Sequence, residues 1–385
     1  MVLPMILRAG QINILDAWRA FHIDLNKVKK YMNAFYVGEV SDYQDQLTED
    51  QVDFRKLRDL IETKGLLKPN PLFYILFLAH LFALEAMSLA IFYYFGVSWP
   101  TYIIVSCLLT TLQAQAGWNQ HDYGHLSVFP SSSLNHAMHH FVIGHIKAAS
   151  SNWWNYRHFR HHAKPNVAVK DPDITMPYFM LFGSVFPVEW GKKKRGFMPY
   201  NYQHNYFLIT LPPLLLPIYF HYVNIVHVIK NRCFIDIFCT ITFFMRHFYC
   251  YGPFLGYGGA FGLYMFVRFL ESFWFTWVTQ MNHIPMKHNR DLRQTWLHLQ
   301  LDATCNIEGG WFNDWFTGHL NYQIEHHLFP TMPRHNYYKV APLVKELCEK
   351  HGINYTKKTL LQGFIDIYLS LKKSGKLWYD AYNEI

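Results

Sequence analysis

Three short stretches of the sequence each place two or three histidines at helical spacing. They read HDYGH at 121–125, HFRHH at 158–162 and QIEHH at 323–327. Residues at i, i+3 and i+4 lie on one face of a helix, so each stretch can direct its imidazoles at one point. Imidazole is the commonest metal ligand among side chains. The pattern therefore predicts a metal site with seven histidine ligands: His121, His125, His158, His161, His162, His326 and His327.

Other histidines receive different interpretations. His283, in TQMNHIP, follows the last long apolar run and is expected to reach the same site as an eighth ligand. A helical stripe beside the first stretch is interpreted as packing or as support for the ligands, with direct ligation as the alternative: His136, His139, His140 and His145. The isolated histidines are interpreted as hydrogen-bonded structural residues: His80, His204, His221 and His298.

The number of imidazoles bears on which metal is bound. Seven or eight neutral imidazoles are too many for one ion, so we expect two ions. A structural zinc site has four ligands and is usually rich in cysteine, whereas the six cysteines here lie far apart and form no CxxC pair. Imidazole alone does not distinguish zinc, copper, iron and nickel. An oxygen-using pair of irons fits an apolar membrane protein, because taking hydrogen from an unactivated methylene requires a cofactor oxidant.

Long apolar runs must position these histidines. The run at 71–99 has a single charged residue, Glu85, and the run at 101–118 follows directly after Pro100. Both are long enough to cross a hydrocarbon layer, so together they predict a transmembrane helical hairpin. Three more apolar runs, which carry prolines or charged residues, follow at 206–229, 234–251 and 254–281.

The number of crossings follows from parity. If all histidine stretches form one site, an even number of spans must separate residues 162 and 321, so two of the three later runs are expected to span. The expected fold is an all-α integral membrane protein, with about four transmembrane helices and a cytosolic helical cap that holds a di-iron centre. A soluble fold, with these runs as core helices, is disfavoured by their length.

The N-terminal part has a different composition. Residues 1–70 are polar, and the stretch at 53–68 predicts an amphipathic helix with Leu57, Leu60 and Ile61 on one face. We therefore expect a polar lead-in at 1–70 and a membrane domain at 71–385. The apolar run at the N-terminus is too short for a signal peptide. A formal net charge of +8 without an RNA- or DNA-binding signature favours a membrane over nucleic acid as the partner.

Basic residues predict the orientation in the membrane. They gather in segments expected on the same side as the histidines: GKKKRG at 191–196, Lys164, Lys170, Lys287, Arg290, Arg293, Lys27, Lys29 and Lys30. Cytosolic loops carry an excess of Lys and Arg, so both termini and the histidine stretches are expected in the cytosol. Widely spaced cysteines agree with a reducing compartment for most of the chain.

The three histidine stretches resemble the histidine boxes of membrane fatty acid desaturases. Glutamine at the start of the third box resembles the front-end subgroup, which places a double bond between an existing one and the carboxyl end. Further stretches extend the similarity to animal polyunsaturated fatty acyl-CoA desaturases of the Δ5/Δ6 type: QAQAGWNQHDYGHLSVF, WVTQMNHIPM, ATCN, FNDWFTGHLNYQIEHHLFPTMPRHNY and SGKLWYDAY. The resemblance runs from about residue 15 to the C-terminus.

This resemblance implies a di-iron centre at an endoplasmic reticulum membrane, which uses O2 and electrons from cytochrome b5 and its reductase. By position, the seven box histidines would be iron ligands, and His283 is similar to the extra ligand beyond the boxes. Gln323 stands where other desaturases have a ligating histidine, so it is expected to bind an ion directly or through a water. His319, expected four residues earlier on the same helical face, could substitute in part.

The sequence departs from the front-end pattern in one respect. Such desaturases usually begin with a fused cytochrome b5 domain that contains His-Pro-Gly-Gly, and this tetrapeptide does not occur here. Residues 9–33 look like the tail of that domain and its linker, so the resemblance implies a form without its electron-donating half. Turnover with separate cytochrome b5 and a catalytically impaired variant both remain open.

A polyunsaturated acyl-CoA is expected to lay its chain in a buried apolar channel, although an acyl-lipid substrate stays open. Basic residues near the second box are expected either to meet the coenzyme phosphates or to be ordinary loop charges: Arg157, Arg160, Lys164, Lys192, Lys193, Lys194 and Arg195. Trp153 and Trp154 are interpreted as interfacial anchors rather than as channel wall. The stretch YFHYVN at 219–224 is a candidate for setting Δ4, Δ5 or Δ6 regiochemistry, which the sequence does not give.

Two classes of alternative function remain. Within the same fold, a fatty acyl or lipid hydroxylase is the nearest, since it shares the metal centre and differs in the product. From a different class, the histidines could serve a zinc-dependent membrane hydrolase or a metal transporter. A hydrolase needs one zinc with an open position, and a transporter should carry ligands within its spans. Iron against zinc content, followed by oxygen dependence, separates these functions.

Overall fold

A computed structural model of the chain describes residues 15–22, 24–32, 34, 36, 47–176, 178–290 and 294–384. Parts of the expected lead-in (1–14 and most of 33–46), the side chain of Lys27, and Arg293 lie outside the described residues. Within them the fold is helical, apart from one isolated bridge and two short parallel strands, β1 (Asn306–Ile307) and β2 (Lys357–Lys358).

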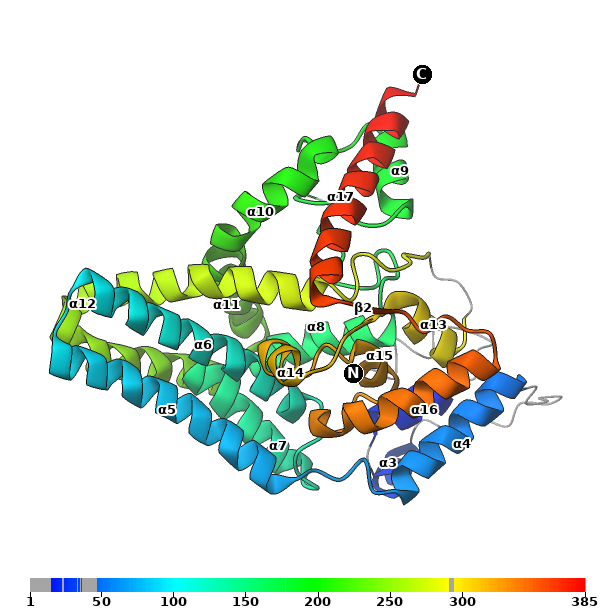
Figure 1. The fold of residues 1–385 in the computed structure, drawn as a ribbon, viewed down its shortest axis with the longest axis horizontal. Coiled ribbons are helices and arrows are strands. Elements are labelled where there is room, and N and C mark those ends of the chain that lie inside the picture. The colour runs from blue at the N-terminus through cyan, green and yellow to red at the C-terminus, as the bar shows by residue number, and fades with distance from the viewer. Residues whose placement is uncertain are drawn as a thin grey trace.

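Helices α5 (Pro71–Phe95) and α6 (Trp99–Gly124) form the predicted hairpin (Figure 1). Helix α5 begins where the Asn70 side chain accepts a hydrogen bond from the backbone of the first turn. It ends at Gly96, whose φ of 69° suits a residue without a Cβ. Ser98 then starts α6 through a reciprocal capping box. These end signals keep the connection short.

Helix α12 (Phe234–Gln280) contains the second hairpin. The helix reverses at Gly256, whose φ of 69° and ψ of 166° are not helical, shortly after Pro253. Across the reversal, His247 Nε2 hydrogen-bonds the carbonyl oxygen of Ala260 at 2.9 Å. The two halves of α12 therefore run antiparallel, and they correspond to the apolar runs predicted at 234–251 and 254–281.

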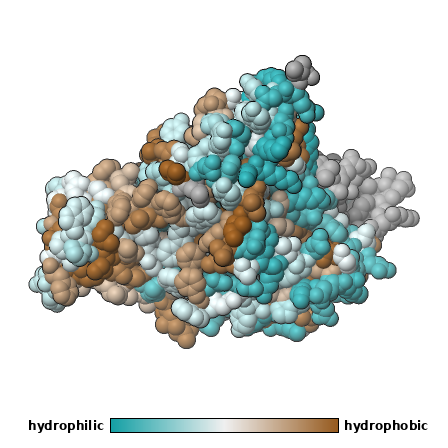
Figure 2. Space-filling model, turned by 45° about the horizontal axis from the view of Figure 1, so that its top comes forward, coloured by the Kyte–Doolittle hydropathy of each residue, from teal (hydrophilic) through white to brown (hydrophobic). Residues whose placement is uncertain are grey.

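The two hairpins pack into one bundle (Figure 1). Leu81 of α5, Leu112 of α6, and Tyr251 and Leu263 of α12 are buried in a single core. The outer faces of the same helices expose large apolar side chains, among them Leu76, Tyr93, Ile103, Phe238 and Tyr249. Figure 2 shows apolar surface over this end of the molecule and polar surface over the opposite end. Extended exposed apolar surface of this kind fits contact with lipid.

Two helical stretches, Pro71–Phe95 and Ile209–Asn231, are long and apolar enough to cross a membrane. The second joins α10 (Gln203–Leu214), the π-helix η4 (Leu215–Phe220) and α11 (His221–Asn231). Three prolines in this stretch, Pro212, Pro213 and Pro217, lack backbone donors. The helix continues past them by widening into π-helical turns, so the apolar run predicted at 206–229 is helical throughout.

The polar end is built from α4 (Glu49–Thr63), α13 (Trp296–Ala303), α15 (Gln323–Leu328) and α16 (Tyr337–Lys350), which share one apolar core. N- and C-terminal parts of the chain thus pack together in this cap. The division into domains at residue 70 stays a prediction. The remaining helices are α2 (Leu15–Phe21), α3 (Leu25–Met32), α7 (Ser132–His139), η2 (His140–Ile146), α8 (Ser151–Ala163), α9 (Val185–Lys192), η3 (Tyr200–Tyr202), α14 (Trp311–Thr317), η5 (Arg334–Asn336) and α17 (Leu360–Asn383).

The amphipathic helix predicted at 53–68 exists as α4, but both of its ends differ from the prediction. It begins earlier, because Thr48 forms a capping box with the first turn, and it ends at Thr63. The predicted apolar face was also wrong in part, since Leu60 is 41% exposed. The buried stripe follows Phe54, Leu57 and Ile61. Leu60 lies one residue, or about 100° of helical rotation, from Ile61 and therefore points away from the core.

Candidate metal centre

Five histidines converge where α6, α8 and α15 meet. The ligand nitrogens of His121, His125, His158, His162 and His326 all lie within 4.8 Å of one another, and we call these residues the first histidine group. His158 Nε2 lies 3.1 Å from that of His121, 2.9 Å from that of His125 and 3.1 Å from that of His162. Several ring nitrogens therefore face one small volume.

Three further histidines form the second histidine group: His161, His283 and His327. Their ligand nitrogens also lie within 4.8 Å of one another. The two groups are neighbours, because the rings of His162 and His327 stack with their centroids 4.2 Å apart. The structure thus brings together all eight predicted histidines. Gln323 joins the second group, since its Nε2 donates to His283 Nε2 at 2.9 Å.

Hydrogen bonds fix the N-terminal end of helix α8, which leads into the site. Ser150 caps it by accepting a hydrogen bond from Trp153 N. Asp236 of α12 reinforces this end, because its carboxylate accepts hydrogen bonds from Ser150 Oγ at 2.5 Å and from Asn152 N at 3.3 Å. The bundle therefore fixes the origin of the helix that carries three of the eight imidazoles.

The outer ring nitrogens are held by residues from other elements. His326 Nδ1 hydrogen-bonds the Tyr337 hydroxyl at 3.0 Å, and His327 Nδ1 donates to Gln300 Oε1 at 2.9 Å. His283 Nδ1 donates to the Ala303 carbonyl oxygen at 3.0 Å. Such contacts fix the tautomer and ring orientation of a metal-binding histidine. In His326 and His327 these contacts leave Nε2 free to face inward, whereas Gln323 contacts the Nε2 of His283.

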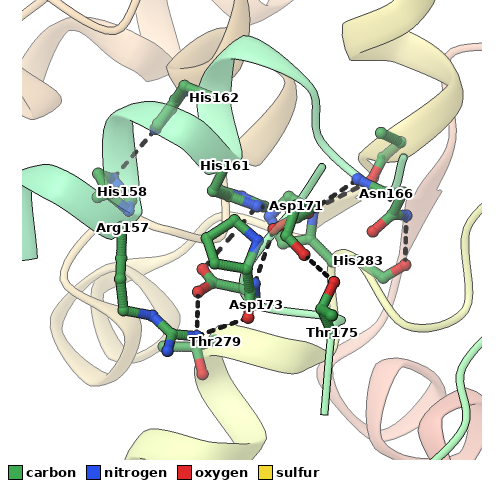
Figure 3. A network of polar contacts seen from close by, with 12 residues as sticks. Arg157, His158, His161, His162, Asn166, Asp171, Asp173, Thr175, Thr279 and His283 are labelled. Atoms are coloured by element: carbon green, nitrogen blue, oxygen red, sulfur yellow. Dashed lines mark hydrogen bonds and ion pairs between the residues drawn. The ribbon is translucent and has the colours of Figure 1, made fainter. Parts of the chain in front are cut away.

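His161 is held differently, by a carboxylate (Figure 3). Its Nδ1 donates to Asp171 Oδ2 at 2.8 Å. Burial disfavours the charged ring, but the neighbouring Asp171 carboxylate outweighs it and raises the pKa of His161. For the Asp171 carboxyl, burial also disfavours the charged form and therefore raises the pKa. The His161 ring and the backbone donors outweigh burial and hold the pKa of Asp171 below its usual value.

The donor set fits metal ions. The Nε2 atoms of His326 and His327 and the Oε1 atom of Gln323 are buried without a hydrogen-bond partner among the described residues. Burial, followed by the neighbouring histidines, lowers the pKa of both histidines well below the usual value, so both rings are neutral. Neutral imidazoles with inward lone pairs can bind Fe2+, Zn2+ or similar ions. The eight imidazoles lie in two adjacent groups, which offer places for two ions.

His319 lies outside both groups. The expectation that it shares a helical face with Gln323 was wrong, because α14 ends at Thr317 and α15 begins only at Gln323. Gly318 and His319 have φ values of 59° and 66°, so the chain turns between these helices. The His319 ring packs edge-on against Phe73 at 5.7 Å.

The histidine stripe on α7 and η2 has other partners, as the packing interpretation predicted. His139 Nε2 lies 2.6 Å from Gln120 Oε1, His140 Nδ1 lies 2.9 Å from Asp236, and His145 Nδ1 lies 2.8 Å from Thr242 Oγ1. None of them joins either histidine group among the described residues.

An apolar cavity leads to the histidines. Four of the eight, His121, His158, His161 and His283, form part of its wall together with Gln323. The rest of the wall is mainly apolar and comes from Met176, Met180, Phe182, Phe207, Leu211, Leu215, Tyr219, Phe220 and Phe275, among others. Trp153 and Trp154 also line it, so their interpretation as interfacial anchors was wrong. Trp154 stacks on His158 with centroids 4.1 Å apart.

The predicted basic residues do not form one cluster. Arg157 lines the cavity and donates to Asp173 Oδ1 at 3.1 Å, whereas Arg160 donates to the Tyr156 hydroxyl at 2.7 Å. Lys164 caps the end of α8. Figure 1 shows α9, which leads into Lys192, Lys193, Lys194 and Arg195, beside the C-terminal end of α17 and away from α8. Contact with coenzyme phosphates stays a prediction.

Several residues that hold the site carry no signal in the sequence. Asp171, Tyr337 and Gln300 contact histidines of the two groups that lie 10, 11 and 27 residues away, and Arg334 contacts the backbone of α6 at Trp118. Their roles depend on contacts that the tertiary fold creates.

Metal binding can be tested without any assay of activity. Adding Fe2+ or Zn2+ to the metal-free chain in detergent should stabilise it, by about 2.7 kcal/mol per ion at 100 times the dissociation constant. Mg2+ should have no such effect, because it prefers oxygen ligands. Thermal unfolding measures both. Equal stabilisation by Mg2+, or none by the imidazole-binding metals, would contradict a metal centre here.

Comparison with protein families agrees with this geometry. The model of the family described as fatty acid desaturase matches residues 97–359. The match covers more than half of the chain and contains all members of both histidine groups.

Proposed function

This chain belongs to the fatty acid desaturase family, and from that premise we propose that it is a front-end desaturase of polyunsaturated fatty acyl-CoA. In this reaction, of the Δ5/Δ6 type, O2-dependent removal of two hydrogens creates a double bond between an existing one and the carboxyl end. One observation carries the proposal: two adjacent groups of histidines come together beside an apolar cavity, and four of their members form part of its wall.

The chain's own residues would form the binding sites for two iron ions. The first histidine group would hold one ion, and the second group, with Gln323, would hold the other. When bound there, the irons would supply the oxidising power, drawn from O2 and from electrons of cytochrome b5 and its reductase, for taking hydrogen from an unactivated methylene. Burial of the ligands excludes water, which protects a reactive centre from side reactions.

The cavity would hold the acyl chain. Aromatic and aliphatic side chains make up most of its wall, so they favour a hydrocarbon, and the four histidines in the wall give that chain access to the metal centre. Arg157 lines the same wall and is the residue of the predicted basic set that would meet the coenzyme phosphates. Tyr219 and Phe220 also line the cavity, which supports the stretch 219–224 as a candidate for setting regiochemistry.

We place four helical segments across an endoplasmic reticulum membrane: α5, α6 and the two halves of α12. Charged residues within them are paired inside the bundle, as Arg246 is with Glu85 and Arg268 with Glu271. The helices α5 and α6 lead up to the first two boxes, and the two halves of α12 lie between these boxes and the third. The two crossings by α12 therefore return the third box to the side of the first two, as the shared site requires. The basic loops favour the cytosol for this side and for both termini.

Filling the cavity should block the reaction but spare the metals. Leu211 of α10 lines the cavity, so Leu211→Trp should lower desaturation at least about tenfold, because a one-Å misplacement of substrate can cost 100-fold. The iron content should stay unchanged. Ile209→Trp is the matched control, since Ile209 lies on the same helix and is 76% exposed. Equal losses in both variants would argue against this cavity as the substrate site.

Product analysis in yeast tests the function itself. The chain is expressed with and without added cytochrome b5, the cells are fed di- and tri-unsaturated fatty acids, and the lipids are analysed. New double bonds nearer the carboxyl end are expected when cytochrome b5 is supplied. A hydroxylated product would instead indicate a hydroxylase of the same fold. No product under either condition, from an iron-loaded chain, would contradict the proposed activity.

A further inference from the structure

Asp171 is a buried carboxylate beside the second histidine group. It is fully buried, and among the ion pairs of the described residues its only partner is His161, at 2.8 Å. A buried carboxylate is costly unless a positive charge accompanies it. Asp122, a carboxylate beside His121, has such a charge, because the Arg334 guanidinium lies 3.6 Å away. The described structure gives Asp171 no lysine or arginine.

A tight loop fixes this carboxylate in place (Figure 3). Asn166 N donates to Asp171 Oδ2 at 2.9 Å, and Asp173 N donates to Oδ1 at 2.8 Å. The Thr175 hydroxyl donates to the Asp171 carbonyl oxygen at 2.6 Å. Both carboxylate oxygens are therefore held by the backbone, and the oxygen that faces His161 has little freedom to move.

The same loop also holds a second ligand. The Asn166 side chain donates from Nδ2 to the carbonyl oxygens of His283, at 2.9 Å, and of Ala303, at 3.3 Å. Ala303 in turn accepts from His283 Nδ1. Asn166 has a φ of 54°, a conformation that asparagine tolerates better than most residues. One loop thus positions two of the three imidazoles in the second histidine group.

We propose that Asp171 is the positioning residue of the second ion: it orients His161 and supplies the negative charge that balances the metal. An ion held by His161 would place a permanent positive charge beside this buried carboxylate, which has no lysine or arginine partner among the described residues. The inference rests on the proposed function for the presence of two ions. It adds that the two positions differ, since five imidazoles form the first group, whereas three imidazoles and an amide form the second.

A competing arrangement uses the same residues. Ligand atoms of His161, Asp171 and Asp173 lie close enough together to hold an ion by themselves. The surroundings oppose this, because backbone donors occupy both oxygens of Asp171, and Arg157 pairs with Asp173 at 3.1 Å. Asp173 therefore distinguishes the two arrangements: it is needed for an ion among these three residues and not for one in the second histidine group.

The test measures Fe2+ binding to the full chain in lipid nanodiscs, without oxygen, by competition with a chelator. Two double variants each keep one histidine group intact. The variant with His125→Ala and His326→Ala keeps the second group, and the variant with His283→Ala and His327→Ala keeps the first. Asp171→Asn should weaken Fe2+ binding about 10- to 100-fold in the chain that keeps the second group, and should leave the other unchanged. Asp173→Asn, the matched control, should leave both unchanged.

The possible results separate the claims. Equal weakening in both backgrounds, or the same loss with Asp173→Asn, overturns the role of Asp171. A wild-type chain that binds fewer than two Fe2+ ions contradicts the proposed function before Asp171 is tested. If the double variants do not fold, Mössbauer spectra of the iron-loaded Asp171→Asn single variant decide. Loss or change of one of two iron signals supports the proposal, and two unaltered signals overturn it.

Discussion

The variant His158→Ala is expected to lose at least about 99% of desaturase activity, more than the 10- to 100-fold typical of residues that only support metal ligands. His158 Nε2 lies within 3.1 Å of three other ligand nitrogens, so the side chain stands at the centre of the first histidine group. Its removal takes away a nitrogen that contacts three of the other ligand nitrogens. Iron per chain should fall together with product formation, and elemental analysis of the purified protein measures this.

A second histidine near the first box provides the control for His158→Ala. His136 of α7 is exposed and belongs to neither histidine group. His136→Ala should therefore keep both iron and activity close to wild type. If the two alanine variants behave alike, or if His158→Ala retains two irons and full turnover, the first histidine group is not the metal site.

The variant Arg334→Met should show the largest loss of stability. Arg334 is 1% exposed, lies 3.6 Å from Asp122, donates to the Trp118 carbonyl oxygen at 2.8 Å, and stacks over Phe77 at 4.3 Å. It joins the segment after the third box to both helices of the first hairpin. Removing one partner of a buried ion pair leaves the other charge uncompensated, so we expect a loss of about 3–5 kcal/mol in the free energy of unfolding.

Thermal unfolding of the purified protein in detergent measures this loss, and two further variants serve as comparisons. Asp122→Asn added to Arg334→Met should recover part of the loss, because the uncompensated charge is then gone. Lys376→Met breaks a surface pair with Asp380 and should cost less than about 1 kcal/mol. A loss from Arg334→Met no larger than that from Lys376→Met would show that the Asp122–Arg334 contact does not hold the cap to the bundle.

The boxes in the sequence do not correspond to the metal positions in space. Within the second box, His158 and His162 belong to the first histidine group and His161 to the second. Residues i and i+4 lie about 40° apart on a helix, whereas i+3 lies on the other side of i. His326 and His327 also separate, because adjacent residues point about 100° apart. Helical spacing therefore identified the histidines that come together but did not show how they divide into two groups.

The sequence also misplaced features whose position depends on packing. The aromatic pair Trp153 and Trp154 is consistent with either a membrane interface or a cavity wall, and only the approach of α8 to α10 and α12 makes it a wall. The spacing between His319 and Gln323 is helical, yet a turn at Gly318 separates them. In both cases the local pattern allowed two structures, and contacts with distant segments selected one.

The sequence by itself determined the eight clustered imidazoles, the first apolar hairpin and the family to which the chain belongs. These are local properties, because residue type, helical period and the length of an apolar run do not depend on distant contacts. Tertiary structure alone decided how the imidazoles divide into two groups, that Asp171 rather than Asp173 faces His161, and where the cavity runs. The choice of Asp171 depends on how the loop that follows His161 folds back on this ring. The grouping and the cavity depend on residues that are far apart in the sequence, as Gln300 is from His162 and Arg334 from Trp118. Their contact exists only once the helices have packed.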